Sequence, residues 1–356
     1  MKKVFAYRLI VVFLLILALS GCGPRGGGRK GGGTTPTTPS PKVYIGGYYH
    51  NYDHSTTGVN TACYWDADGR HDLGDGSSDS EVVWLSFYNN ELYAIGSYYD
   101  RTAGKTVPCY WKNNTKENLD DINSVPGYVN VHCGFVYNDQ VYAGGSYLVG
   151  SQRIPCYWDQ NGRHDLAIPE GESAEVTTLF VNSDGVYAGG FLYPWTACYW
   201  DEKGELHQLN GKDVKEMKIV NGCIYLGGAN ESGACYWVID GEQERIVQLE
   251  GIDTEVYSIF VQDDKVYAGG RFNISYTFPR KFTACYWDED GKQHYFQSEH
   301  DESIAEAIFV YDNQVYAAGW FGDVYGYSAC YWDSAGRYEL DDNGSDLSYG
   351  KCIFVR

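Results

Sequence analysis

The chain has 356 residues, among them 33 Tyr, 43 Gly and 10 Trp but only 2 Met, and its formal net charge is −20. Aromatic residues favour strands and glycine favours turns, so this composition indicates an all-β protein. A chain of this length can bury a core large enough to fold without disulfides or metals. Proteins bind phosphate backbones through clustered Lys and Arg, and this chain has the opposite charge balance. We therefore expect no nucleic-acid partner.

Residues 1–21 have the build of a bacterial signal peptide. A basic start precedes the apolar run from Leu9 to Leu19, which is too short to cross a membrane as a helix. The motif Leu19-Ser20-Gly21-Cys22 resembles the lipobox of bacterial lipoproteins, in which the cysteine is acylated. The resemblance implies a membrane partner through a lipid anchor on Cys22, in the bacterial cell envelope, and Gly23 favours the outer membrane, facing the periplasm or the outside. The alternative is an ordinary secretory signal with an incidental cysteine.

Residues 22–42 are predicted to be the lipidated cysteine and a disordered tether. After Cys22 the segment is rich in Gly, Thr and Pro and has no apolar periodicity, so it cannot build a core. The signal and tether hold seven basic residues and no acidic one. Residues 43–356 therefore keep 20 of the 27 basic residues and all 47 acidic ones, a net charge of −27.

Residues 43–356 contain one unit repeated seven times. A V-Y-A-G-G motif, as in 141–145 and 266–270, is followed in each unit by C-Y-W. The cysteines of C-Y-W recur with a mean period of 44.5 residues, at Cys63, Cys109, Cys156, Cys198, Cys235, Cys285 and Cys330. Units of 40 to 50 residues with four short strands are typical of β-propeller blades.

The two ends of the repeat region supply different strands of one unit. Residues 42–47 match the second strand of the other repeats, whereas Cys352 to Val355 match the first strand. Pairing these segments would close the ring and remove exposed sheet edges. The sequence therefore predicts an all-β, seven-bladed β-propeller over residues 43–356, closed by its N- and C-terminal strands in one blade.

The repeat resembles the kelch type over residues 43–356. The order is an aliphatic-Tyr strand that ends in a Gly doublet, followed by a strand that bears Tyr and Trp. Repeats of the VYAGG and ACYW form also resemble those of bacterial cell-envelope lipoproteins. The resemblance implies the fold and the location, and it implies no activity, because propellers host binding modules and enzymes alike.

The repeated cysteines are predicted to be small buried side chains rather than disulfides. Equivalent positions in neighbouring packed sheets lie about 10 Å apart, beyond the roughly 7 Å over which a disulfide joins Cα atoms. In the tightest hairpin we expect Cys235 to lie opposite Gly227. Cys133, Cys223 and Cys352 lie on or beside first strands, and one bridge among them is left open.

Histidines and acidic segments give weaker signals. His71, His164, His207 and His294 share one position on the fourth strand, which indicates architecture. His50, Asp53 and His54 could bind a transition metal, but a loop of this spacing fixes no geometry, so we expect no metal and no cofactor. Calcium could bind the acidic stretches 250–255, 299–306 and 341–346, but solvated connectors are the favoured interpretation.

The loops between second and third strands are the predicted binding site. They vary from 6 to 15 residues, whereas the turns on the opposite face barely vary, and variable loops on a rigid scaffold usually carry binding. Aromatic side chains with basic neighbours suit a glycan or a protein. The candidate residues are Tyr49, Tyr52, Arg101, Arg153, Tyr193, Trp195, Arg271, Tyr276, Arg280, Trp320, Phe321 and Tyr325. The alternative is that the aromatics nearest each doublet continue the second strand and pack between blades.

These observations together predict a membrane-tethered, non-enzymatic binding lipoprotein that recognises a glycan or a protein through the loop face. The alternative is a scaffold subunit of a cell-envelope complex. A carbohydrate-active enzyme is a third, less favoured hypothesis, because no pair of carboxylates is marked in the sequence. The ligand, the membrane leaflet and the oligomeric state cannot be read from the sequence.

Overall fold

The computed structural model describes residues 40–51, 58–124, 127–274, 281–296, 302–323, 326–340 and 347–356. The chain divides into two units, Met1–Ser40 and Pro41–Arg356. Cys22, the predicted signal peptide and the tether up to residue 39 lie outside the described residues. Within the described parts of the chain, no helix has the length and apolar character needed to cross a membrane.

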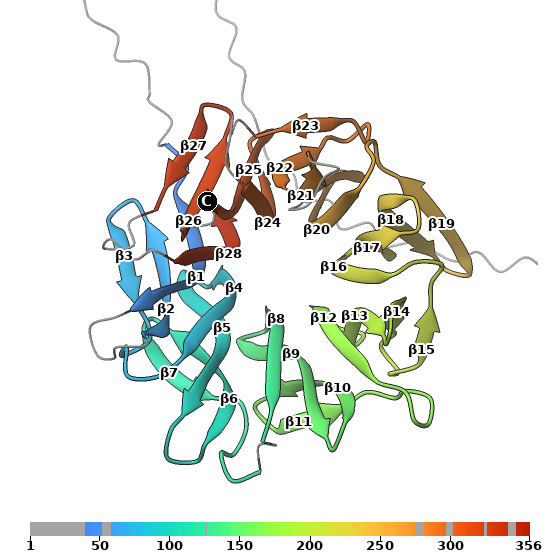
Figure 1. The fold of residues 1–356 in the computed structure, drawn as a ribbon. Helices are drawn as coiled ribbons and strands as arrows, with labels where there is room; N and C mark the ends of the chain where they lie inside the picture. Colours follow the sequence, from blue (N-terminus) through green and yellow to red (C-terminus); the bar gives the residue numbers. More distant parts are fainter. Residues whose placement is uncertain are drawn as a thin grey trace, which may run out of the picture. The chain divides into compact units, whose positions relative to one another are not determined.

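The described residues of the second unit form 28 strands in seven antiparallel, four-stranded sheets arranged in a ring (Figure 1). The first strands, which surround the centre, are β4 (Ser80–Tyr88), β8 (Val129–Tyr137), β12 (Ala174–Val181), β16 (Asp213–Val220), β20 (Thr254–Gln262), β24 (Glu302–Tyr311) and β28 (Ser348–Val355). The second strands are β1 (Val43–Asn51), β5 (Glu91–Asp100), β9 (Gln140–Val149), β13 (Val186–Leu192), β17 (Cys223–Asn230), β21 (Lys265–Asn273) and β25 (Gln314–Asp323).

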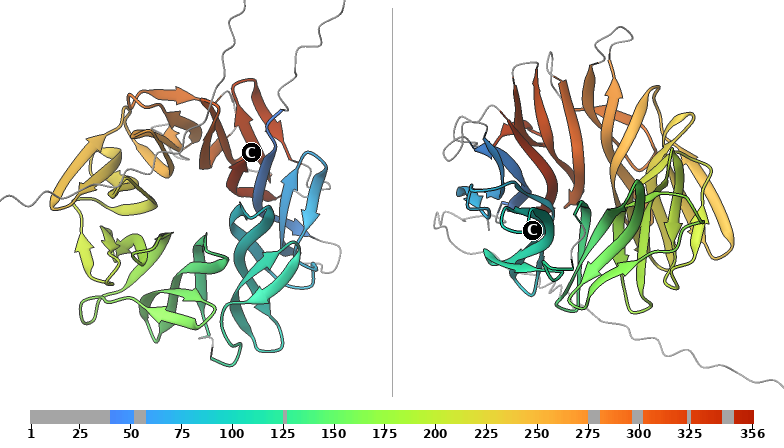
Figure 2. Two further views of the ribbon diagram at one scale, coloured as in Figure 1. Left: turned by 180° about the vertical axis from the view of Figure 1, so that it is seen from behind. Right: turned by 60° about the horizontal axis from the view of Figure 1, so that its bottom comes forward.

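The third and fourth strands form the outer part of each blade. The third strands are β2 (Val59–Asp66), β6 (Lys105–Lys112), β10 (Gln152–Asp159), β14 (Thr196–Trp200), β18 (Gly233–Asp240), β22 (Phe282–Trp287) and β26 (Gly326–Asp333). The fourth strands are β3 (Gly69–Asp72), β7 (Thr115–Asn118), β11 (Gly162–Asp165), β15 (Leu206–Gln208), β19 (Gln243–Gln248), β23 (Gln293–Tyr295) and β27 (Gly336–Glu339). Figure 2 shows the same ring of sheets from behind.

The ends of the repeat region complete one blade, as predicted. Strand β28 pairs with β1 in the sheet β28-β1-β2-β3, from Val355 opposite Val43 to Ser348 opposite Tyr49. Two further backbone hydrogen bonds join Lys42 and Arg356, at 2.7 and 3.0 Å. The predicted fold class, an all-β seven-bladed propeller closed by N- and C-terminal strands, is confirmed.

Neighbouring blades are joined at the start of the first strand. In four blades the alanine of A-C-Y-W donates its backbone N–H to a Ser or Thr hydroxyl that opens the next first strand. The pairs are Ala62 with Ser80, Ala234 with Thr254, Ala284 with Ser303 and Ala329 with Ser348, at 2.8 to 3.1 Å. At these four junctions the side-chain hydrogen bonds hold the first strand in register with the preceding blade. The register decides which side chains of the first strand face the centre of the ring.

The C-Y-W motif builds the core of each blade. Its tryptophans are at most 1% exposed in all seven blades: Trp65, Trp111, Trp158, Trp200, Trp237, Trp287 and Trp332. Its cysteines are completely buried, and all ten cysteines from Cys63 onward are free thiols. Cys235 lies opposite Gly228 rather than Gly227, because Ala234 pairs with Ala229 and the whole hairpin is shifted by one residue from the predicted register.

The repeated fourth-strand histidines form part of the blade architecture. His71 stacks on Tyr64 with ring centroids 4.5 Å apart, and its Nε2 lies 2.8 Å from Asp66. His164, His207 and His294 repeat the arrangement. Three potential metal ligands, on Asp201, Glu205 and His207, come within 4.8 Å of one another, but the Asp–His contact there is the one repeated in the other blades.

Every first strand contains a β-bulge at the same place. In β8, for example, Val131 pairs with Gly145 and Cys133 with Gly144, so His132 is an extra residue. The seven extra residues, called the bulge residues below, are Val83, His132, Thr177, Lys215, Tyr257, Glu306 and Lys351. Bulges re-aim side chains and are frequent beside functional sites.

Candidate functional site in the central cavity

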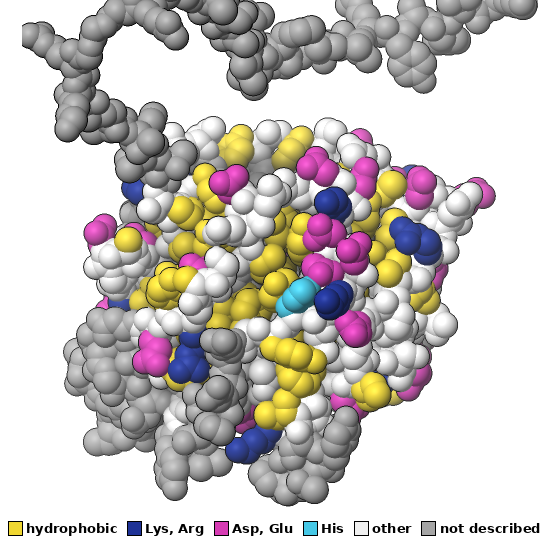
Figure 3. Space-filling model, turned by 90° about the horizontal axis from the view of Figure 1, so that it is seen from above, with side chains coloured by type: hydrophobic (Ala, Val, Ile, Leu, Met, Phe, Trp, Pro, Cys, Tyr) yellow, Lys and Arg dark blue, Asp and Glu magenta, His cyan; other side chains and the backbone are white. Residues whose placement is uncertain are grey.

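A cavity of about 600 Å³ lies in the centre of the ring, between the first strands of all seven blades. All seven bulge residues line it, together with other side chains of the same strands. A cavity of this size suits a small ligand. By contrast, the side of the molecule in Figure 3 carries acidic and basic side chains next to one another, with hydrophobic side chains exposed between them.

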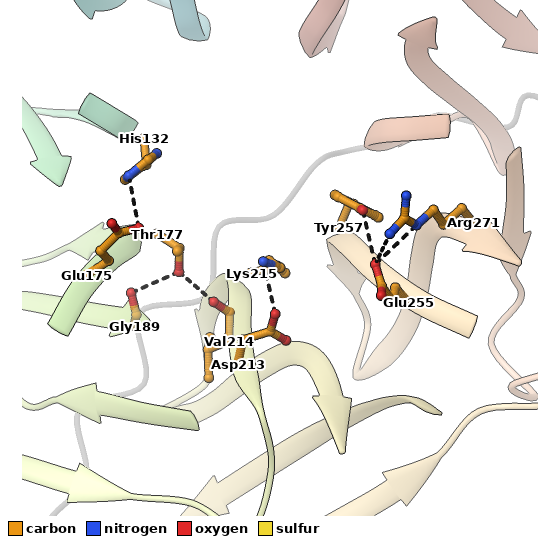
Figure 4. Close-up of polar contacts among 10 residues, drawn as sticks. All are labelled: His132, Glu175, Thr177, Gly189, Asp213, Val214, Lys215, Glu255, Tyr257 and Arg271. Carbon is orange, nitrogen blue, oxygen red and sulfur yellow. Dashed lines mark hydrogen bonds and ion pairs between the residues drawn. The ribbon is translucent and has the colours of Figure 1, made fainter. Parts of the chain in front are cut away.

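Glu175 is the centre of a polar group between β8 and β12. Its carboxylate accepts contacts from His132 Nε2 at 3.3 Å, Arg153 at 3.0 Å and the Tyr193 hydroxyl at 2.8 Å. Figure 4 shows the His132 side chain directed at Glu175. Burial raises the pKa of Glu175, but the hydrogen bond from His132, the charges of His132 and Arg153 and the Tyr193 hydroxyl together lower it below its usual value. The Glu175 side chain is therefore ionised and held in one orientation.

A second polar group lies on β16. Lys215 Nζ is 2.9 Å from one carboxylate oxygen of Asp213, and the other oxygen of Asp213 is buried without a hydrogen-bond partner (Figure 4). Further along the strand, Glu216 contacts Lys218 and accepts a hydrogen bond from Ser258 of the next blade. Both lysines of this strand that line the cavity are thus paired with carboxylates.

Two more carboxylates are paired on the following blades. Glu255 accepts a hydrogen bond from the Tyr257 hydroxyl at 3.1 Å and two from the guanidinium of Arg271, at 2.8 and 3.1 Å (Figure 4). Burial, and then the charge of Glu255, raises the pKa of Tyr257, so this phenol is neutral. Another cavity-lining carboxylate, Glu306, belongs to the next blade.

Glu306 lies between an indole and a lysine. It accepts hydrogen bonds from Trp320 Nε1 and from Lys351 Nζ, both at 3.1 Å. Burial lowers the pKa of Lys351, but Glu306, Tyr48 and Glu81 together more than offset this, and the net pKa lies above the usual lysine value. Lys351 is therefore a charged side chain that faces the cavity from the last strand of the chain.

The later part of the first strands lines the cavity with aromatic rings. Phe135, Phe260, Phe309 and Phe354 line it beside Trp84, and the ring centroid of Phe309 lies 4.9 Å from that of Phe260 and 5.4 Å from that of Phe354. Each of these rings is half-buried. Because the charged bulge residues precede the rings in the strands, the cavity has a charged part and an aromatic part.

The structure divides the predicted loop residues into three groups. Arg153, Tyr193, Arg271 and Trp320 bond carboxylates beside the central cavity, as described above. Tyr49 and Phe321 lie under Arg70 and Arg337, with the guanidinium carbon 3.6 and 3.5 Å from the ring centroid, so they join second strands to fourth strands. Trp195 is 60% exposed and stacks on Phe191, and Arg101 is exposed in a turn.

Several predicted residues cannot be placed. Tyr52, Tyr276, Arg280 and Tyr325 lie outside the described residues, as do Asp53 and His54 of the weak metal hypothesis. The third member of that hypothesis, His50, has its Nδ1 3.0 Å from Asn60 Oδ1.

The bulge residues were missed by the sequence analysis. Their types differ from blade to blade, so no repeat motif marks them. A usable signal was the last glycine of the aliphatic-Tyr motif in each repeat. In one repeat, a Cβ on Gly190 would lie 1.9 Å from the carbonyl oxygen of Glu175, because the bulge brings that oxygen close to the glycine. A glycine that allows such an approach indicates a distorted partner strand.

Comparisons with known proteins place the chain among β-propellers. No family model and no curated protein matches it. The chain is similar to the β-propeller domain of the Trilobed protease from Pyrococcus furiosus, with a TM-score of 0.50 and 11% identity, over 86% of this chain and 93% of that one. It is also similar to a puromycin-hydrolyzing peptidase from Mycobacterium tuberculosis, with a TM-score of 0.51 and 10% identity, over 86% of this chain and 52% of that one. This chain thus spans about half the length of that peptidase.

These likenesses show the fold alone, and one difference is visible within it. The Pyrococcus furiosus propeller has an open velcro topology, whereas here β28 and β1 pair in one closed blade. The kelch-type resemblance finds no matching family model.

The predicted function is wrong. A non-enzymatic lipoprotein that binds a glycan or protein through its loop face was expected, but the two similar structures described above are the propeller domain of a protease and a peptidase. Charged side chains also line the central cavity. Four of the predicted loop residues bond carboxylates beside it: Arg153, Tyr193, Arg271 and Trp320. The loop face was predicted from loop length, aromatic content and basic neighbours, and none of these features identifies a ligand.

Proposed function

We propose that the chain accepts short peptides in its central cavity. The observation that carries this proposal is the combination of side chains of both charges with a row of phenylalanines in one cavity of about 600 Å³. A short peptide carries an ammonium, a carboxylate, backbone amides and apolar side chains, so it can use both parts of the cavity. A neutral glycan carries neither an ammonium nor a carboxylate, so it would meet the charged part of the cavity through neutral hydrogen bonds alone.

The names of the similar proteins agree with this class of ligand. One is the propeller domain of a protease, and the other is a peptidase of which this chain spans about half. We therefore propose that the propeller admits or selects peptides, and that cleavage of these peptides takes place in another domain or protein.

The test is to block the cavity without altering the loop face. Val83 is an apolar bulge residue that lines the cavity, so Val83→Trp should fill it. Val149 is 56% exposed at the end of β9, so Val149→Trp makes the same change outside the cavity. Titration calorimetry with tri- to pentapeptides should show binding that Val83→Trp weakens at least about tenfold and Val149→Trp leaves unchanged. Equal effects of the two variants, or no binding of any peptide, would refute the proposal.

Two finer assignments remain separate proposals. The blades are of the kelch type, supported by the Gly doublet of five repeats and the Tyr-Trp pair of all seven. The chain is anchored in the bacterial cell envelope through Cys22, supported by the lipobox-like residues 19–22. Labelling cells with a clickable fatty acid should mark the full chain and not its Cys22→Ser variant. Unlabelled protein in the membrane fraction would contradict the lipid anchor.

A further inference from the structure

Resting on the proposed function, we infer that Glu81 binds the free amino terminus of the peptide. Glu81 is in β4 and lines the central cavity. Glu81 lies two residues before the bulge residue of its strand. Glu175 and Glu255 occupy the same position in their own first strands. The equivalent residues therefore show how this chain neutralises a carboxylate at this position, and how Glu81 differs.

The cations around the cavity already have carboxylate partners. Arg153 and His132 contact Glu175, and Arg271 contacts Glu255. On the strands themselves, Lys215 contacts Asp213, Lys218 contacts Glu216 and Lys351 contacts Glu306. Among the residues that the structure describes, Glu81 is the cavity-lining carboxylate left outside these pairs.

The cross-strand neighbour explains why Glu81 is left over. Glu255 faces Arg271 across the β20–β21 pair, and the guanidinium bonds it there. At the same register in the β4–β5 pair, Glu81 faces Ser97, which can offer one hydrogen bond but no charge. The blade thus has a serine where its counterpart has the neutralising cation.

The surroundings of Glu81 favour a small cation from outside. Burial raises the pKa of Glu81 above its usual value, and the charges of Lys351 and His132 offset this rise only in part. Lys351 is committed to Glu306. Trp84 follows in the same strand and also lines the cavity. Burial raises the pKa of Tyr48 to about 12, and the charge of Glu81 adds to this rise. A carboxylate beside aromatic rings is a favourable environment for an ammonium group.

This assignment orients the ligand in the cavity. With its amino terminus at Glu81, a peptide extends past the bulge residues toward Phe135, Phe309 and Phe354, which lie further along their strands. We therefore expect peptides with a free amino terminus and an apolar side chain at the second or third residue to bind best.

The experiment measures how much affinity the free amino group contributes. The probes are Ala-Ala-Phe, its N-acetyl form, and N-acetyl-Ala-Lys-Phe, whose only ammonium is on a side chain. Each is titrated into the full chain, into Glu81→Gln and into Glu231→Gln, a control carboxylate that is 90% exposed. Melting curves of all three proteins verify folding.

A charge-assisted hydrogen bond of this kind should make N-acetylation weaken binding about 10- to 100-fold in the unmodified chain and in Glu231→Gln. In Glu81→Gln the acetylated and free peptides should bind within about twofold of each other. The lysine-containing acetyl peptide should bind as weakly as N-acetyl-Ala-Ala-Phe.

Other results would overturn the inference in recognisable ways. If acetylated and free peptides bind equally well to the unmodified chain, Glu81 is not an amino-terminus site, although the cavity still accepts peptides. If the lysine-containing probe recovers full affinity, the site recognises any primary amine rather than the amino terminus. If none of the three probes binds the unmodified chain, or if Val83→Trp leaves their binding unchanged, the proposed function itself fails.

Discussion

Gly145 lies so close to Asn130 that a Cβ on the glycine would be 1.9 Å from the Asn130 carbonyl oxygen. Asn130 precedes the bulge in β8 that places His132 at the central cavity. The equivalent glycine in the other blades lies equally close to a carbonyl oxygen of the first strand, for example Gly190 to Glu175. The repeated glycine and the residues that line the cavity are therefore two consequences of one backbone feature.

A methyl group at Gly145 should disrupt this feature. The neighbouring atom is backbone, which cannot rotate away, so Gly145→Ala should lower the free energy of unfolding by about 1–3 kcal/mol. The control is Gly127→Ala, where an added Cβ meets no atom within 4 Å; it should change stability by less than about 0.5 kcal/mol. Urea denaturation of both variants measures the difference. Equal stability of the two would show that the glycine is not required by the bulge.

The seven-bladed fold could be predicted because its signals repeat. The tryptophans and cysteines of C-Y-W are buried at the same position in every blade, so the sequence shows seven copies of one packing solution. The pairing of the terminal strands followed from the same repeat, because Cys352 to Val355 completes a unit that begins at residue 42.

The functional site could not be predicted in the same way, because its residues do not repeat. Val83, Thr177 and Lys351 occupy equivalent bulges but share no chemistry, and only the ring closure brings them to one cavity. The loop residues that were predicted, such as Arg153 and Arg271, reach the site through Glu175 and Glu255, which lie on first strands. Sequence spacing alone does not show these contacts.

Removing the last strand should open the ring. Deletion of residues 352–356 removes the pairing of Val355, Phe354 and Ile353 with β1 and leaves the β1 edge exposed. We expect a marked fall in melting temperature and a broader transition, measured by circular dichroism. As a control, Val149→Trp alters an exposed strand end and should keep the original melting curve. An unchanged melt after the deletion would contradict closure by β28.

Glu175 should make the stability of the propeller depend on pH. Burial raises its pKa, but His132 and its other partners bring the pKa below its usual value of 4.5. A carboxylate with a lowered pKa in the folded state stabilises the fold above its unfolded pKa, and this contribution is lost as the pH falls through the folded value. Glu175→Gln should therefore be less stable than the unmodified chain at pH 7, with the gap narrowing below about pH 4.5. Urea titrations at pH 7 and pH 3 measure the gap; a gap of the same size at both would show that its ionisation does not matter.

The free thiols should differ sharply in reactivity. Burial raises the pKa of Cys198, Cys235 and Cys285 to about 12, and these side chains are completely shielded from solvent. Cys223 is only half-buried, although its pKa is also raised, first by desolvation and then by nearby aspartates. With Ellman's reagent at pH 8 the native chain should therefore show one fast-reacting thiol among the ten described cysteines, and Cys223→Ala should remove it. In denaturant all ten should react together. A fast phase that persists in Cys223→Ala would mean that one of the core cysteines is reached by solvent, and that the packing of C-Y-W against the glycine doublet opens in the native state.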